Sequence, residues 1–319
     1  MTNLKPWLPM AGQIARLKQR GLLVDNDDAA LNYLARIGYY RLSGYWYPLR
    51  AIDAAASAQR QRPVRSDQFV PDSHFEDVVR LYVFDKKLRM LALDALERIE
   101  MAVRVDVAHL LGQKNPCAHE EPDCLHGNFA KKVKVRGKDK GKTDHQVWLE
   151  KYSSMVYRAR REPFIEHHQS KYGGKLPVWV AIEVWDFGLL SRLFAGMQHK
   201  DKSQIAQKYG LPEGRLLQNW LRSLNFIRNV SAHHSRLWNI NVVEQAPLPE
   251  GWPKMNTARP FMYFGIMQQL MQVICPNSSW GERLAELLRE FPTPRNGAMN
   301  IGDLGVCVDW ESWLLKGQK

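Results

Sequence analysis

The chain has 319 residues, of which 45% are hydrophobic and 24% are charged, ordinary fractions for a soluble globular protein. It contains neither the long apolar run of a membrane span nor the apolar core of a signal peptide, so we expect a cytoplasmic protein without membrane contact. Four scattered cysteines argue against a disulfide scaffold. The net charge of +12 favours a polyanionic partner such as RNA, with an anionic membrane surface as the competing interpretation.

One long helix is the clearest element that the sequence predicts. Two or three short helices are expected before residue 72, and an S-x-x-E pattern at 73–76 then indicates a helix N-terminus. From there to Gly112 no Gly or Pro occurs, and apolar residues recur at helical spacing from Leu81 to Val103. The pattern predicts one helix of roughly 38 residues, about 57 Å long, as the spine of a bundle.

An irregular insert follows at about 113–143 and contains the run KKVKVRGKDKGK, with seven basic residues and one acid. Such a run repels itself and has no apolar face, so we expect it to be mobile and to bind RNA phosphates. The candidate RNA-binding residues of this region and of the helix after it are Lys131, Lys132, Lys134, Arg136, Lys138, Arg158, Arg160 and Arg161. The alternative interpretation is an ordinary solvated loop.

Further helices are predicted along the rest of the chain. Thr143 and Gln146 form a possible capping box, and that helix should bend or restart at Pro163. Pro177 suits the first turn of a helix through VWVAIEVWDFGLLSRLF, and Pro212 opens another that runs directly into the segment RNVSAHHSRLWN. Two shorter helices are expected at about 258–275 and 279–290.

No convincing strand pattern occurs, so the predicted fold class is all-α. We expect three regions: N-terminal helices in 1–72, a bundle in 73–245 and C-terminal helices with a tail in 246–319.

The pairs Cys117/His119 and Cys124/His126 suggest a zinc site as one interpretation of the insert. Structural zinc sites usually have cysteines two to four residues apart, a spacing that these two cysteines exceed. A polar loop is therefore preferred, and no metal is expected.

The segment RNVSAHHSRLWN, at 228–239, places two arginines and two histidines at the end of an apolar helix. Arg228 and His233 are five positions apart, about 140° around an ideal helix, so they converge only through a helix end, arginine's reach or a second subunit. Chance alone supplies such a pair in a chain of this composition, and a second copy, Arg104 and His109, lies within the long helix.

The residue types suit RNA cleavage without a metal. A base must take the proton from the 2′-OH, an acid must protonate the leaving 5′-oxygen, and a cation must hold the charge that builds on the phosphoryl oxygens. Histidine, with an unperturbed pKa near 6.5, suits the first two roles. Arginine offers a planar, permanently charged fork for the third.

The run RNVSAHHSRLWN resembles the signature of abortive-infection proteins of the AbiD/AbiF type, in the HEPN superfamily. That signature has arginine, a polar residue, three variable residues and histidine, here Arg228, Asn229, the residues 230–232 and His233. The segments RIGYYRLSGYWYPLR, YVFDKKLRMLALDALERIEMAVR and FGLLSRLF are also similar to that family. The resemblance covers about residues 8–275, and the insert is its least similar part.

The resemblance implies a HEPN-like helical bundle with additional N- and C-terminal helices, a homodimer that brings two motifs together, and a metal-independent endoribonuclease without a cofactor. It implies a role in defence against phage, and in some relatives an association with a structured noncoding RNA. Arg228 is then the phosphate clamp, His233 the catalytic imidazole and Asn229 an orienting group. His234 and Arg236 are secondary candidates, with helix capping by His234 and an ion pair of Arg236 as the structural alternatives.

Two interpretations of another class stay open. A binding module that sequesters a structured RNA without cutting it fits the charge equally well, and a protein-interaction role within a defence complex would make the charge incidental.

Overall fold

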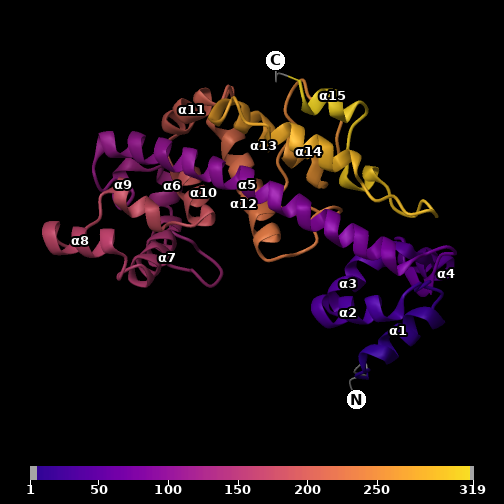
Figure 1. Ribbon diagram of the computed structural model, residues 1–319. Helices are drawn as coiled ribbons and strands as arrows, with labels where there is room; N and C mark the ends of the chain where they lie inside the picture. Colours follow the sequence, from indigo (N-terminus) through magenta and orange to yellow (C-terminus); the bar gives the residue numbers. More distant parts are fainter. Residues whose placement is uncertain (1–5, 317–319) are drawn as a thin grey trace.

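The computed structural model describes residues 6–316, and its axis is the helix α5, Phe75–Lys114. Its 40 residues confirm the predicted long helix, and the other elements are arranged along it (Figure 1). The predicted capping box at Ser73 is wrong: the Ser73 hydroxyl donates to the Val70 carbonyl at 2.7 Å, and His74 precedes the first turn without a side-chain cap. The hydroxyl is therefore engaged in the turn before the helix.

The N-terminal elements pack at one end of α5 (Figure 1). They are the helices α1 (Met10–Gln19), α2 (Asp27–Ile37), α3 (Tyr39–Trp46) and α4 (Ala54–Arg60), a 3₁₀ turn at Tyr47–Leu49, and the strands β1 (Arg50–Ile52) and β2 (Arg65–Phe69). The strands form an antiparallel pair in which Arg50 faces Phe69, whereas no strand was predicted. They are three and five residues long, and β2 is mostly polar, so neither strand gives a clear alternating pattern.

The middle of the chain packs at the other end of α5 (Figure 1). Its helices are α6 (Gly127–Ala130), α7 (Asp144–Arg158), α8 (Pro163–Tyr172), α9 (Val178–Ala181) and α10 (Phe187–Gly196), with 3₁₀ turns at Pro122–Cys124 and Ile182–Val184. The capping box at Thr143 and Gln146 and the restart at Pro163 are confirmed. The single helix predicted after Pro177 is wrong, because the chain leaves the helix at Trp185 and Asp186 caps a new one, accepting from Leu189 N–H at 2.6 Å.

The remaining helices are α11 (His199–Lys208), α12 (Gly214–Ala232), α13 (Pro260–Ile274), α14 (Trp280–Arg289) and α15 (Trp310–Leu314), with a 3₁₀ turn at Ile301–Leu304. α12 crosses α5 and packs on α10, α11 and α13, while α13 and α14 lie along α5 (Figure 1). α11 was not predicted; α12, α13 and α14 were.

One apolar core runs through the molecule, from Ile14 in α1 to Leu314 in α15. The architecture confirms the all-α prediction apart from the small β1–β2 pair. Among residues 6–316, no helix has the length and apolar character needed to cross a membrane.

Candidate active site at the end of helix α12

The helix α12 ends inside the RNVSAHHSRLWN segment in a tight left-handed turn. His233 is the C-cap, and His234 follows with a φ of 57°. The His234 N–H donates to the Ser231 carbonyl at 3.1 Å, and the Ser235 N–H donates to the Val230 carbonyl at 2.9 Å. This hydrogen-bond pattern is a Schellman motif, in which glycine usually occupies the left-handed position. A histidine there costs about 1 kcal/mol relative to glycine, so neighbouring contacts must hold the turn.

A buried carboxylate of α5 holds the backbone directly after this turn. Asp85 is fully buried and accepts the backbone N–H groups of Leu237, at 3.1 Å, and Trp238, at 2.7 Å. It also accepts the Tyr45 hydroxyl at 2.6 Å and forms an ion pair with Arg89. Burial raises the pKa of the Asp85 carboxyl, and the Arg89 guanidinium opposes that effect. The network thus joins α3, α5 and the end of the motif.

Helix α3 makes two further contacts with the motif. The Arg41 guanidinium donates to the His234 carbonyl, and the Arg236 guanidinium donates to the Gly44 carbonyl. Burial lowers the pKa of Arg236. In this arrangement Arg236 ties the motif to α3, and the aromatic segment RIGYYRLSGYWYPLR forms part of the support of the turn.

The four candidate catalytic residues occupy two neighbouring parts of α12. Arg228 and Asn229 are half-buried on its last turns, with the Arg228 guanidinium donating to the Asn229 side-chain oxygen at 3.3 Å. His233 and His234 are exposed at the helix end. The structure therefore places a half-buried cation beside an amide and an open pair of imidazoles one turn further on.

A carboxylate of α5 lies near the motif arginine. Burial raises the pKa of Glu100, and the positive charges of Arg104 and Arg228 oppose this rise. The Arg104 guanidinium lies 2.5 Å from a Glu100 oxygen, so Glu100 is shared between a direct ion pair and the field of Arg228. Its charge partly offsets that of Arg228.

The second arginine-x4-histidine copy has a different environment. Arg104 donates to the Trp185 carbonyl in addition to Glu100, which engages it inside the protein. His109 is exposed and still helical, five residues before α5 ends at Lys114, with Gln113 at 3.0 Å from its ring. This copy has no helix end and no left-handed turn, and Arg104 has a structural role.

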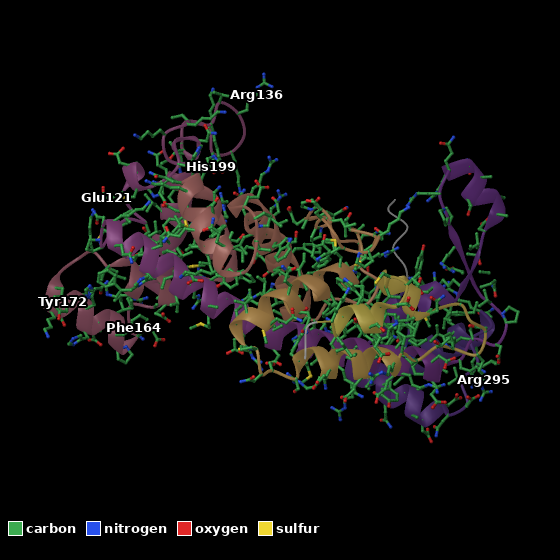
Figure 2. The ribbon with its side chains drawn as sticks, turned by 90° about the horizontal axis from the view of Figure 1, so that it is seen from above. Glu121, Arg136, Phe164, Tyr172, His199 and Arg295 are labelled. Carbon is green, nitrogen blue, oxygen red and sulfur yellow. The ribbon has the colours of Figure 1, made fainter. Side chains whose placement is uncertain are left out.

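The basic run of the insert forms a loop that folds back on itself. The Lys134 N–H donates to the Lys142 carbonyl at 2.9 Å, and the Gly141 N–H donates to the Lys134 carbonyl at the same distance. Arg136 lies at the tip, where the loop projects from the body (Figure 2). Lys131 pairs with Asp123 at 2.7 Å, and Lys134 pairs with Asp144 at 2.8 Å. Lys132, Arg136 and Lys138 are exposed.

Three basic residues at the end of α7 and in the turn before α8 belong to this same end of the molecule. Arg158, Arg160 and Arg161 are exposed, and Arg160 lies 4.1 Å from the centre of the Tyr157 ring. Within residues 6–316, no hydrogen bond or ion pair joins these residues or the basic loop to the motif at the end of α12. No direct polar contact among the described residues therefore links the two candidate regions.

The cysteines and histidines of the insert are not gathered into a metal cluster. In the part of the chain that the structure describes, no group of three or more His, Cys, Asp or Glu side chains is arranged to hold a metal. His119 is buried against Trp148, Tyr152 and Trp185, and the His126 ring packs on His199 with centroids 4.8 Å apart. Nothing in this arrangement supports the zinc interpretation.

Comparison with protein families gives a match to the family described as Abi-like protein, over residues 32–239. The chain belongs to this family. The matched span begins in α2 and ends directly after Trp238, so it includes α3, α5 and the whole motif of this Abi-like protein. Searches of curated proteins and of solved structures gave no significant match. Membership of the Abi-like family indicates a role in abortive-infection defence.

The sequence alone did not reveal the residues that support the motif, namely Tyr45, Asp85, Arg89 and Glu100. A signal for two of them was present: Asp85 and Arg89 lie one turn apart on the same helix face as Leu81 and Leu88, among buried positions. Charged groups at buried positions require partners, so two opposite charges among buried positions indicate a supporting ion pair.

Proposed function

We propose that this Abi-like protein is a metal-independent endoribonuclease that acts in abortive infection, with Arg228 and His233 at its reaction centre. The observation that carries the proposal is the exposed His233 at the end of α12, one turn beyond a half-buried arginine and beside a left-handed turn at a non-glycine residue. Strained turns of this kind persist where other contacts enforce them, and they cluster at functional sites.

The proposed reaction needs no metal. His233 takes the proton of a ribose 2′-OH, the 2′-oxygen forms a bond to the adjacent phosphorus, and the bond from phosphorus to the 5′-oxygen breaks. A second imidazole protonates that leaving oxygen, which gives a 2′,3′-cyclic phosphate and a 5′-OH end. The Arg228 fork stabilises the charge on the phosphoryl oxygens, and the Asn229 amide, hydrogen-bonded to Arg228, orients it.

A homodimer completes this site. Arg228 and His233 project about 140° apart on an ideal helix, so one chain presents them to different sides of the α12 end. Two copies related by a two-fold axis through this region supply one histidine as base and the other as acid. His234, next to His233, is the second candidate for the acid.

The exposed cations of the basic loop also fit an alternative, a module that sequesters a structured noncoding RNA without cutting it. Lys132, Arg136 and Lys138 are exposed, with Arg136 at the projecting tip of the loop (Figure 2), and they suit phosphates of any sequence. Backbone binding there is equally compatible with both functions, so cleavage chemistry is what distinguishes them.

The experiment that tests the proposal is incubation of the purified protein with single-stranded RNA in excess EDTA. The expected products carry a 2′,3′-cyclic phosphate or its hydrolysis product at one end and a 5′-OH at the other. A strict requirement for Mg²⁺, or products with a 5′-phosphate, would contradict the mechanism.

A further inference from the structure

A cavity of about 500 Å³ lies among the N-terminal elements, away from the Asp85 network. Its walls come from the chain before α1, from α1 and α3, and from β1 and β2. The side chains that give it chemical character are Trp7, Arg16, Arg20, Tyr40, Tyr47 and Arg50, with Asp67 as the acidic residue.

The cavity is lined by more arginine than acidic side chains. Arg20 forms an ion pair with Asp67, and the Arg50 guanidinium lies 3.1 Å from the other oxygen of Asp67. Arg16, half-buried on α1, has no hydrogen bond or ion pair with any residue in 6–316. No Arg16 nitrogen is among the buried side-chain atoms without a partner, so the guanidinium is open to solvent and available to the oxygens of an anion such as phosphate.

Three aromatic side chains at the same cavity expose their rings. Trp7 is 83% exposed, Tyr40 is 91% exposed and Tyr47 is 46% exposed. The guanidinium carbons of Arg50 and Arg65 lie 6.0 and 5.9 Å from the centre of the Tyr47 ring. Open aromatic faces beside arginines are the combination that binds single-stranded nucleic acid, where bases stack and phosphates pair.

Helix α3 connects this cavity to the end of α12. Tyr40 and Ser43 line the cavity, while the neighbouring Arg41 and Gly44 contact His234 and Arg236. The cavity and the motif therefore lie on two sides of one helix, whose diameter with side chains is about 10–12 Å. An extended strand held in the cavity has the motif within reach.

We propose that this cavity binds one nucleotide of single-stranded RNA, with its base stacked on Tyr40 or Trp7 and its phosphate on Arg16. A nucleotide fits better than an acidic peptide, because the exposed groups are flat rings next to a guanidinium rather than a row of cations. The proposal that the cavity binds a nucleotide depends only on these contacts. Only its consequence, that the cavity holds the strand that the motif cuts, rests on the proposed function.

The test measures binding of a fluorescein-labelled ten-nucleotide uridine RNA by anisotropy, in EDTA and in the His233→Ala background so that the RNA stays intact. Tyr40→Ala is expected to weaken binding about tenfold with an unchanged salt dependence, because it removes stacking and no charge. Arg16→Gln should weaken binding and make the slope of log K against log salt shallower by about 0.7. The matched control is Tyr33→Ala, since Tyr33 is 40% exposed in a different groove, between α2 and α5, and should bind as the parent does.

A second measurement needs no cavity variant: RNA containing 4-thiouridine, irradiated with the unmodified protein, should crosslink to peptides that contain Tyr40 or Trp7. Parent-like binding by both variants, or crosslinks confined to the 131–138 loop, would overturn the proposal. The outcomes for the two proposals can be distinguished. If the wild type never cuts RNA but Tyr40→Ala and Arg16→Gln bind it weakly, the cavity binds RNA and the nuclease proposal is wrong. If the wild type cuts RNA and both variants bind it normally, only the proposal for the cavity is wrong.

Discussion

The carboxylate of Asp85 in α5 accepts the backbone N–H of Trp238 at 2.7 Å, across 153 positions of the chain. This bond fixes the end of the RNVSAHHSRLWN segment to the long helix α5, along which the other elements are arranged. Since Asp85 also balances the charge of Arg89, one side chain supports both the core and the candidate site.

The first prediction concerns that pair. Asp85→Asn leaves the Arg89 guanidinium buried without its counter-charge, so it should lower the free energy of unfolding by about 3–5 kcal/mol. The measurement is urea unfolding followed by circular dichroism. Asp94→Asn is the matched control. Asp94 pairs with Arg98 at the same spacing on α5 and also with Arg283, but the three side chains are 30–44% exposed, so the cost should stay below about 1 kcal/mol. Equal costs for the two variants would contradict the importance of the buried network.

The second prediction concerns the left-handed turn. His234→Gly and His234→Ala both remove the imidazole, but only glycine relieves the backbone at a φ of 57°. The glycine variant should therefore be more stable than the alanine variant by about 1 kcal/mol, measured by thermal unfolding. A more stable alanine variant would show that the turn is not strained. A cleavage rate that falls equally in both variants reports on the lost imidazole, and a difference between their rates reports on the left-handed turn.

The third prediction concerns the buried histidine of the insert. Burial lowers the pKa of His119 to about 3, and no hydrogen bond reaches either ring nitrogen from residues 6–316. The nearest carboxylate, Glu120, is 3.8 Å away, and the positive charges of His145 and Lys175 further oppose protonation. The unfolded chain takes up the proton at a pKa near 6.5, so stability should fall as the pH falls from about 6.5 towards 3.

The expected slope from His119 approaches about 1.4 kcal/mol per pH unit within that window. His119→Leu should remove this part of the slope, while His145, whose pKa is also lowered by burial, retains its own. The check is to measure the free energy of unfolding of the wild type and of His119→Leu from about pH 4 to about pH 7, a range that covers most of this window. An identical slope in the two would contradict the assignment.

The fourth prediction concerns the basic loop. Replacing Lys131, Lys132, Lys134 and Arg136 with Gln should weaken RNA binding to a similar extent for unrelated sequences, because phosphate contacts carry no sequence information. The slope of log K against log salt should become shallower by about 0.7 for each phosphate of a single strand that the variant no longer neutralises. Lys131 and Lys134 already pair with Asp123 and Asp144, so the change should come mainly from Lys132 and Arg136. An unchanged slope would show that the loop does not neutralise RNA phosphates.

Local signals in the sequence predicted much of the helical framework. The stripe from Leu81 to Val103, the capping box at Thr143 and Pro163 each act within a few residues, and the structure confirms the elements that they predict. The β1–β2 pair and the break at Trp185 were missed, because short polar strands and a capping Asp186 give weak patterns inside otherwise ordinary segments.

The candidate site could likewise be predicted from the sequence only in part. Arg228, Asn229 and His233 could be selected from residue chemistry and from the resemblance, but their supports could not. Arg41 reaches the His234 carbonyl across 193 positions, and Asp85 reaches the Trp238 N–H across 153. Such pairings follow from how α3, α5 and α12 pack, which no local pattern specifies.

The most direct test of the account compares RNA cleavage by His233→Ala and His109→Ala, two exposed histidines with the same spacing from an arginine. With each variant shown to be folded, His233→Ala should abolish cleavage and barely change RNA affinity, because it removes the base and leaves the cationic surface intact. His109→Ala should cut as the wild type does. If His233→Ala retains full cleavage, or if both variants lose it equally, the assignment of the reaction to the end of α12 is wrong.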